Sequence, residues 1–321
     1  MSSESDARAG TQPGHLIAFI SDAHPDIGDD QLAQARLDLL DSLKANQSVR
    51  LIVYSGDCFG DLQCSTARRL LLEPKLRKWY EKVREIADDP EAPRQFVVLG
   101  NHDRDITRKR GAALRALLPD NNERFPVVLH GAPGTQIDPD LAGWFVTHGD
   151  EFDWTTPMWV SLLFAGRALL GEEGMATVAQ WIIGRYFFFT TPGRKRQLML
   201  RPGKQKRINR DTDRYEKTIP GIHRKAWIRA QDRQELILFG HTHYEFSGCK
   251  PLGRMATLNP GALDAVDAMT YGLFDTRSRE FSLMKFDSTA HTSKAALTQT
   301  LWPVSCRRGF RGPRPDSPPA I

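Results

Sequence analysis

Short apolar runs recur along the chain, and each stops abruptly at a glycine or a polar residue. Unbroken runs of this kind are typical of strands that are buried on both faces of a sheet. The pattern predicts strands at residues 16–21, 51–55, 95–99, 126–129, 144–147 and 235–239. Later runs predict strands at residues 255–258, 271–275 and 280–286, with a hairpin turn at residues 276–279.

Between these runs the apolar residues change to helical spacing, so helices are predicted at residues 31–45, 65–87 and 110–118. Strands that alternate with helices indicate an α/β fold with a largely parallel sheet. In open α/β sheets, ligands bind beyond the carboxyl ends of the strands. The residues that follow each predicted strand are therefore the first candidates for a functional site.

The length of 321 residues suits one large α/β domain with an insertion, or two smaller domains. The strand pattern favours a main domain over residues 15–287, interrupted by a helical, basic insertion at about 154–230. Residues 1–14 are polar, and the tail at 288–321 is rich in Pro and Arg. We expect the first segment to be disordered and the tail to be mostly so, because neither has enough apolar surface to offset the entropy of ordering.

The positive charge is concentrated in the insertion. Residues 185–229 contain 14 Lys or Arg and 3 Asp or Glu, whereas the whole chain has a formal net charge of +5. Such a segment attracts phosphorylated substrates, nucleic acid or an acidic lipid surface, although a solvated loop would look the same. Five of the seven tryptophans lie between Trp144 and Trp227, which is compatible with a lid that contacts lipid or with two helices packed over a sheet.

The remaining composition favours a cytoplasmic protein that can also associate peripherally with a membrane. The N-terminus has no apolar signal segment, and no apolar run is long enough to span a bilayer. The four cysteines show neither CxxC nor zinc-finger spacing, which is typical of reduced thiols. No obligate protein partner is inferred.

Five motifs that follow apolar runs carry the candidate chemistry: Asp22-Ala23-His24, Gly56-Asp57, Gly100-Asn101-His102-Asp103, His148-Gly149-Asp150 and Gly240-His241-Thr242-His243. Residues two apart in an extended chain point to the same side, as Asp22 with His24 and His241 with His243 would. Carboxylate, amide and imidazole donors of this kind suit two divalent ions, for which we expect Mn, with Fe, Zn or Co as alternatives. The candidate metal ligands are Asp22, His24, Asp57, Asn101, His148, His241 and His243.

Several neighbours of these donors have two interpretations. Gly56, Gly100 and Gly240 each precede a candidate ligand and would allow close backbone approach, or they are ordinary turn residues. Cys58 follows Asp57 and either packs beside the site or has a ligand or redox role. Acidic residues after His148, namely Asp150 and Asp153, are interpreted as hydrogen-bond partners of the ligands or as loop caps.

The order of the five motifs resembles the pattern D-x-H, G-D, G-N-H-D/E, H and G-H-x-H of the calcineurin-like metallophosphoesterase superfamily, over residues 16–275. The resemblance implies a four-layer α/β/β/α sandwich with the helical insertion added. It implies that Asp57 bridges two ions, and the other ligands divide between them as Asp22, His24 and His243 for the first ion and Asn101, His148 and His241 for the second. A metal-bridging hydroxide would then attack phosphorus. His102 would assist catalysis, oriented by Asp103, or would only be a structural neighbour of Asn101.

Residues 148–153 are also similar to the UDP-2,3-diacylglucosamine pyrophosphohydrolases, with two departures. Typical members have Arg at the position of His102, and Leu-His-Leu where this chain has Ala-His-Pro. We therefore expect a dinuclear phosphoesterase that acts on an anionic phosphomonoester, phosphodiester or pyrophosphate. The alternatives are a nuclease that uses the basic segment, a lipid-linked UDP-sugar pyrophosphohydrolase, and a non-catalytic module. Such a module would be expected to lack some of the ligands, and none is missing here.

Overall fold

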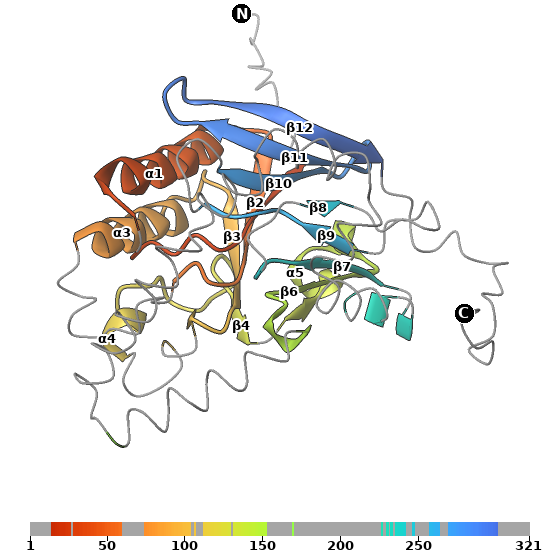
Figure 1. The fold of residues 1–321 in the computed structure, drawn as a ribbon, viewed down its shortest axis with the longest axis horizontal. Coiled ribbons are helices and arrows are strands. Elements are labelled where there is room, and N and C mark those ends of the chain that lie inside the picture. The colour runs from red at the N-terminus through yellow and green to blue at the C-terminus, as the bar shows by residue number, and fades with distance from the viewer. Residues whose placement is uncertain are drawn as a thin grey trace, which may run out of the picture.

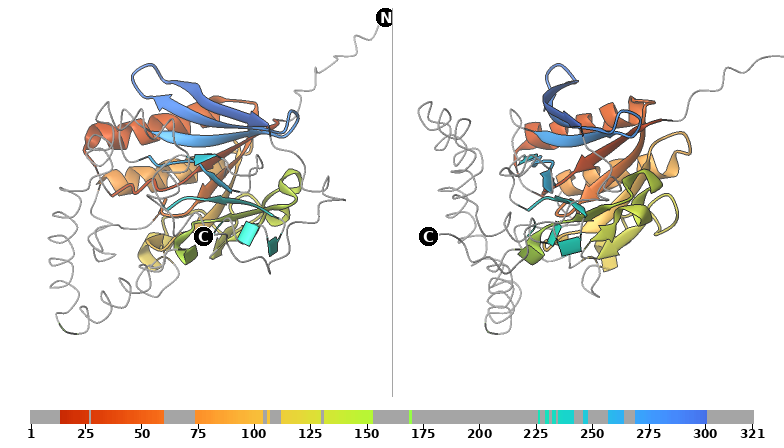
Figure 2. Two further views of the ribbon diagram at one scale, coloured as in Figure 1. Left: turned by 45° about the vertical axis from the view of Figure 1, so that its right-hand side comes forward. Right: turned by 90° about the vertical axis from the view of Figure 1, so that its right-hand side faces the viewer.

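The computed structural model shows two β-sheets that face each other, with helices along the outer side of the larger sheet (Figures 1 and 2). No helix in the part of the chain that it describes is long and apolar enough to cross a bilayer. The residues that it describes are 14–26, 28–59, 74–103, 106, 112–129, 131–152, 169, 226, 229–230, 232–233, 235–241, 246–247, 257–263 and 269–300.

The larger sheet has seven strands in the order β12-β11-β10-β1-β2-β3-β4. Its parallel half consists of β1 (Leu16–Ile20), β2 (Val49–Ser55), β3 (Arg94–Leu99) and β4 (Val127–Leu129). Its antiparallel half consists of β10 (Thr270–Asp275), β11 (Glu280–Asp287) and β12 (Thr292–Thr300). The parallel half places the ends of β1, β2 and β3 along one edge, where the first three motifs begin.

The smaller sheet has five strands in the order β5-β6-β7-β9-β8. Its central strands β6, β7 and β9 are parallel, and the two short edge strands run antiparallel. The strands are β5 (Ala132–Pro133), β6 (Trp144–Thr147), β7 (Leu236–Phe239), β8 (Phe246–Ser247) and β9 (Thr257–Asn259). The fourth and fifth motifs therefore also follow parallel neighbours, because His148 comes after β6 and His241 after β7.

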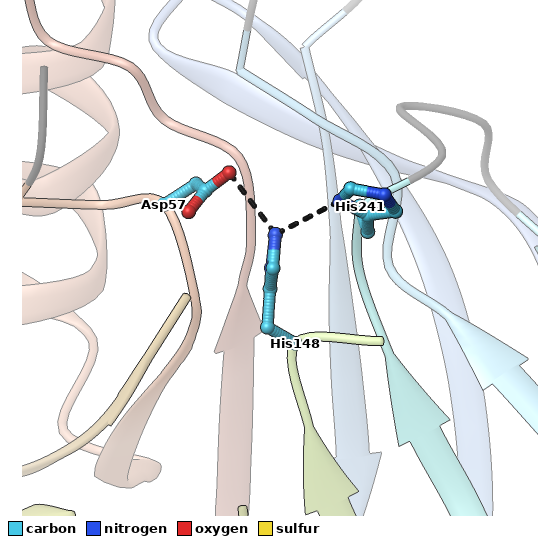
Figure 3. A group of neighbouring side chains, drawn as sticks. All are labelled: Asp57, His148 and His241. Atoms are coloured by element: carbon cyan, nitrogen blue, oxygen red, sulfur yellow. Dashed lines mark hydrogen bonds and ion pairs between the residues drawn. The ribbon is translucent and has the colours of Figure 1, made fainter. Parts of the chain in front are cut away.

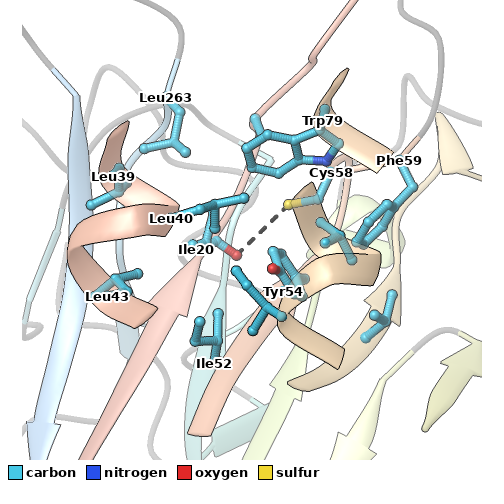
Figure 4. Packing of buried hydrophobic residues seen from close by; sticks show 14 of the residues in the cluster. Ile20, Leu39, Leu40, Leu43, Ile52, Tyr54, Cys58, Phe59, Trp79 and Leu263 are labelled. Atoms are coloured by element: carbon cyan, nitrogen blue, oxygen red, sulfur yellow. Dashed lines mark hydrogen bonds between the residues drawn. The ribbon is translucent and has the colours of Figure 1, made fainter. Parts of the chain in front are cut away.

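Helices α1 and α3 cover the outer face of the larger sheet. Helix α1 begins after Asp29, whose carboxylate accepts a hydrogen bond from the Leu32 N–H at 2.9 Å and so caps the helix. Figure 4 shows Leu40 of α1 and Trp79 of α3 beside Ile52 and Tyr54 of β2. The helices are α1 (Asp30–Ala45), α3 (Pro74–Asp88), α4 (Ala112–Arg115) and α5 (Gly134–Ile137), with 3-10 turns η3 (Pro139–Leu141) and η4 (Asp150–Phe152).

A second apolar cluster fills the space between the two sheets. In β1, Phe19 faces this cluster, whereas Ala18 and Ile20 belong to the cluster beneath the helices. The Phe19 ring stacks on Trp144 of β6, with ring centroids 5.8 Å apart. Since β1 is covered on both faces, its sequence is apolar without alternation, as predicted.

The prediction of a mixed α/β fold is confirmed, and its strands form two sheets. The turn predicted at residues 276–279 joins β10 and β11. Residues 65–73 and nearly all of 154–230 lie outside the described residues. The helical insertion and the fourth layer therefore stay predictions.

The prediction for the tail is wrong over residues 292–300, which form β12 and pair along the whole of β11. This strand has few apolar residues, and the side chains of Thr292, Lys294 and Thr298 are exposed. A strand at the edge of a sheet can be polar on its exposed face, so it leaves little hydrophobic signal in the sequence. The sheet therefore extends beyond the boundary expected at residue 287.

Candidate metal centre

Five parallel strands from the two sheets end at one side of the molecule and bring their motifs together. Asp22 and His24 follow β1, Asp57 follows β2, and Asn101 follows β3. From the smaller sheet, His148 and His241 follow β6 and β7. Figure 3 shows Asp57 from the larger sheet approaching these two histidines from the smaller one.

One donor group is centred on the Nε2 atom of His148. This atom lies 3.0 Å from Asp57 Oδ2, 3.0 Å from Asn101 Oδ1 and 3.2 Å from Nδ1 of His241. Four atoms that carry lone pairs thus approach one another, which requires a proton or a cation among them. Their mixture of oxygen and imidazole nitrogen fits a divalent transition metal.

A second donor group lies beside the first. The ligand atoms of Asp22, His24 and Asp57 all lie within 4.8 Å of one another, and the three side chains are buried. Asp57 belongs to both groups, so a single carboxylate links them. The structure therefore brings together six of the seven candidate ligands, and His243 lies outside the described residues.

The backbone at these residues is strained. Asp22, His24, Asp57 and His241 have φ angles of 50°, 38°, 52° and 66°, and they are four of the six non-glycine residues with positive φ in the described part of the chain. Each such residue costs about 1–3 kcal/mol and persists only where its surroundings hold it. Here the loops hold each other, since Asp22 N donates to Gly56 O and His24 N to Asp57 O, both at 3.0 Å.

Glycines give the ligands the room they need, as the sequence suggested. A Cβ atom on Gly100 would overlap Asp57 Oδ1, and a Cβ atom on Gly56 would overlap the His148 ring. Gly56 also has a φ of 97°, which side chains disfavour. Any larger residue at these two positions would displace a candidate ligand.

The backbone holds a proton on Nδ1 of His148. Its Nδ1 atom lies 3.3 Å from the carbonyl oxygen of Ser55, which can only accept a hydrogen bond. Nδ1 therefore carries a proton, and Nε2 faces Asp57 and Asn101. A histidine ligand is commonly oriented in this way by a hydrogen bond to its other ring nitrogen.

Asp57 and His148 form a buried ion pair. Burial opposes the charged form of Asp57, but His148, His102 and His24 hold its pKa well below the usual value. Burial likewise opposes the charged form of His148, but the negative charges of Asp57, Asp22 and Asp150 raise its pKa well above 6.5. Each group favours the charge of the other, and the positive charge on His148 satisfies the surrounding oxygen atoms.

Asp103 joins two loops, and its role in orienting His102 stays a prediction. Its carboxylate accepts hydrogen bonds from Phe59 N at 2.8 Å and Gly100 N at 2.9 Å. Burial and the charge of Asp57 raise the pKa of Asp103 to about 6, against these two bonds. The backbone N–H of His102 instead donates to Asp57 Oδ1 at 2.9 Å, and its ring lies edge-on to His24.

Cys58 and Asp150, whose roles the sequence left open, are buried beside the site. Cys58 is buried, its thiol donates to Gly56 O at 3.2 Å, and burial raises the pKa of the thiol well above its usual value. These features favour packing over a ligand or redox role. Asp150 is buried in η4, and Asp153 lies outside the described residues.

Two supporting side chains, those of Ser21 and Asn259, were missed from the sequence, as was the backbone carbonyl of Ser55. Asn259 is fully buried, donates from Nδ2 to Gly240 O at 2.9 Å and accepts from Gly261 N at 2.8 Å. It thereby fixes the peptide before His241. Its position at the end of β9, before Pro260 and Gly261, follows the same strand-end rule as the motifs and could have indicated it.

The model of a family described as calcineurin-like phosphoesterases matches residues 15–245. No curated protein matches the chain. Among solved structures, an archaeal phosphodiesterase is similar at 16% sequence identity and a TM-score of 0.36, over 84% of this chain and 98% of that one.

Proposed function

The chain belongs to the calcineurin-like phosphoesterase family, and on this premise we propose that it is a dinuclear metal-dependent phosphoesterase. The proposal is carried by one observation. Two groups of Asp and His side chains share the buried carboxylate of Asp57 at the ends of parallel strands. A shared carboxylate between two donor groups is the arrangement that holds two divalent ions next to each other.

The first ion would be held by Asp22, His24 and Asp57, and the second by Asp57, Asn101, His148 and His241. By resemblance to the family pattern, His243 would complete the first set. Mn is the ion we propose, with Fe, Zn and Co as alternatives for the same donors. When bound, two such ions lower the pKa of a water molecule and neutralise charge on phosphoryl oxygens.

The exposure of the site indicates where the substrate enters. Asp22, His24, Asp57 and His148 are buried, whereas Asn101, His102 and His241 are partly exposed. A phosphate group would therefore approach over Asn101, His102 and His241. In this position the imidazole of His102 can donate a proton to the leaving oxygen or to a phosphoryl oxygen.

The bond to be cleaved is a phosphomonoester, phosphodiester or pyrophosphate in an anionic substrate. Most of the basic segment at residues 185–229 lies outside the described residues, but Arg229 is described. Its guanidinium lies 4.1 Å from the ring centroid of Phe145 in β6 and 3.5 Å from the Glu151 carboxylate. The end of the segment is thus attached to the strand that precedes His148, and we propose that the segment helps to hold the substrate.

The proposal is tested with protein that has been stripped of metal and then reloaded with Mn²⁺. Wild type should hydrolyse an aryl phosphate or a bis-aryl phosphodiester only after reloading, and Asp57→Asn and His241→Asn should abolish the activity. His15→Asn and His291→Asn are matched controls, because each histidine faces a carboxylate far from the site, Asp275 and Asp38 respectively. Full activity in the Asp57→Asn and His241→Asn variants would refute the assignment.

A substrate panel separates the remaining alternatives. It contains phosphomonoesters, phosphodiesters, nucleotide pyrophosphates, lipid-linked UDP-sugars and single-stranded nucleic acid. Nuclease activity that depends on the basic segment should weaken steeply as salt is raised, because phosphate contacts release counterions. Turnover of the lipid-linked substrate that requires vesicles would instead support contact with a membrane surface.

A further inference from the structure

Ser21, the residue before the first motif, contacts a candidate ligand directly. It is fully buried at the end of β1, and its Oγ atom lies 2.5 Å from Oδ2 of Asp22. The backbone N–H of His241 donates to the same Oδ2 atom at 2.9 Å. One oxygen of the Asp22 carboxylate therefore accepts two hydrogen bonds from the protein.

The Ser21 hydroxyl has one proton and two acceptors within reach. The second acceptor is the carbonyl oxygen of Ser55, at 3.2 Å. The contact with the Asp22 carboxylate is shorter and therefore stronger, so the Ser21 hydroxyl donates its hydrogen bond to Asp22. Ser55 provides a natural comparison, because it is equally buried at the end of β2 and donates to the carbonyl of Ile20 at 3.1 Å.

The other oxygen of Asp22, Oδ1, faces the ligand side. It lies 3.9 Å from Nε2 of His24, and Asp22, His24 and Asp57 form one of the two donor groups. The two hydrogen bonds to Oδ2 fix the rotation of the carboxylate about its bond to Cβ. They thereby present a single oxygen to the ion that this group would hold.

The neighbouring loop is shaped around this contact. A Cβ atom on Gly240 would overlap Ser21 Oγ and would lie 2.5 Å from Asp22 Oδ2. The absence of a side chain at Gly240 therefore allows the Ser21 hydroxyl to reach Asp22 beside the His241 backbone. Strands β1 and β7, from different sheets, meet at this point.

We propose that Ser21 is a positioning residue of the metal centre, whose hydroxyl orients Asp22 so that Oδ1 binds the ion shared with His24 and Asp57. The inference rests on the proposed function, since it requires that the protein binds metal. Removing an outer hydrogen-bond partner of a ligand weakens metal affinity by roughly tenfold to hundredfold.

The test is calorimetric titration of metal-stripped full-length protein with Mn²⁺, repeated with Co²⁺ and its visible absorption spectrum. Ser21→Ala should lower the affinity for one of the two ions by roughly tenfold or more and alter the Co²⁺ spectrum. Ser55→Ala, which keeps the carbonyl of Ser55, should bind both ions within about threefold of wild type. Ser21→Cys fills the space with a poor donor, so it should resemble Ser21→Ala and serves if that variant does not fold.

The outcomes separate this inference from the proposed function. If wild type binds two equivalents and Ser21→Ala and Ser21→Cys bind them equally well, the inference is refuted and the metal assignment stands. If wild type binds no Mn²⁺ or Co²⁺, both are refuted. If Ser55→Ala loses as much affinity as Ser21→Ala, the effect belongs to the packing of the strand ends, and the role of Ser21 is refuted.

Discussion

Nε2 of His148 and Oδ2 of Asp57 lie 3.0 Å apart, and both side chains are almost completely buried. In the metal-free protein this pair carries a proton at the centre of four donor atoms. A divalent ion bound by the same atoms would have to replace that proton. Protonation and metal binding therefore compete for one position, which makes the site sensitive to pH.

The first prediction concerns the stability of the metal-free protein. The pKa of His148 is raised well above 6.5 on folding, mainly by Asp57 against the effect of burial. Its contribution to stability is therefore complete below about pH 6.5 and is lost as the pH rises through the raised pKa. Urea unfolding in EDTA should show a falling free energy of unfolding above neutral pH, and Asp57→Asn should flatten the profile. A flat profile in wild type would contradict the ion pair.

The second prediction concerns proton release. Because a metal binds neutral imidazole, Mn²⁺ must displace the proton of His148. The apparent affinity should rise about tenfold per pH unit below the pKa of His148 if one proton is released. Calorimetry in two buffers with different ionisation enthalpies measures that number directly. Equal heats in both buffers at neutral pH would show that His148 is already neutral in the metal-free protein.

The third prediction concerns Gly100. Its replacement by Ala places a Cβ atom inside the space of Asp57 Oδ1 and 2.6 Å from Asp57 N. Overpacking of this kind costs about 1–3 kcal/mol, and we expect Mn²⁺ affinity to fall by more than about tenfold, because Asp57 serves both donor groups. Gly28→Ala is the control, since its Cβ atom would also be overpacked, but the nearest atoms, from 2.5 Å, belong to Leu32 and not to a candidate ligand. Equal losses of metal affinity in both variants would contradict the explanation.

Much of the fold follows from the sequence because buried strands leave a strong signal. Strand β1 is apolar at every position, since helices cover one face and the second sheet covers the other. Strand β12 and the two-residue strand β5 leave no such signal, being polar at an edge or too short for a pattern. The division into two sheets also depends on pairing between distant strands, which periodicity does not encode.

The candidate ligands could be predicted from the sequence for a related reason. Parallel strands end on the same side, so residues such as Asp57 and His148 could be expected to meet. Their supporting contacts could not, because they depend on loops with unusual backbone angles. Asp103 accepts N–H groups from two such loops, and no spacing rule distinguishes this from a contact with the neighbouring His102 ring.

The fourth prediction separates Asp103 from His102. Asp103→Asn should leave one buried N–H of Phe59 or Gly100 without an acceptor, at a cost of about 1–3 kcal/mol in the free energy of unfolding. His102→Asn should change that free energy by less than about 0.5 kcal/mol but should lower kcat. Urea unfolding at about pH 8 keeps Asp103 ionised, because its pKa is about 6. If Asp103→Asn lowered only kcat, Asp103 would act through His102 after all.

The last prediction concerns Glu151, which binds the residues on either side of His148. Its carboxylate accepts hydrogen bonds from Thr147 Oγ1 at 2.7 Å and Gly149 N at 3.2 Å, and it pairs with Arg229 at 3.5 Å. Glu151→Ala should release the turn that carries His148 and weaken Mn²⁺ binding severalfold. Arg229→Gln should weaken it less, because the pair is partly exposed and is worth about 0.2–1 kcal/mol.

A double-mutant cycle decides whether the basic segment acts on the site through this contact. If Arg229 acts through Glu151, the double variant should bind Mn²⁺ as weakly as Glu151→Ala alone, since the charge of Arg229 then has no partner in the turn. Arg233→Gln is the matched control, because Arg233 follows the basic segment, is exposed and should leave the affinity unchanged. Additive losses in the double variant would mean that Arg229 supports β6 through the Phe145 ring, independently of Glu151.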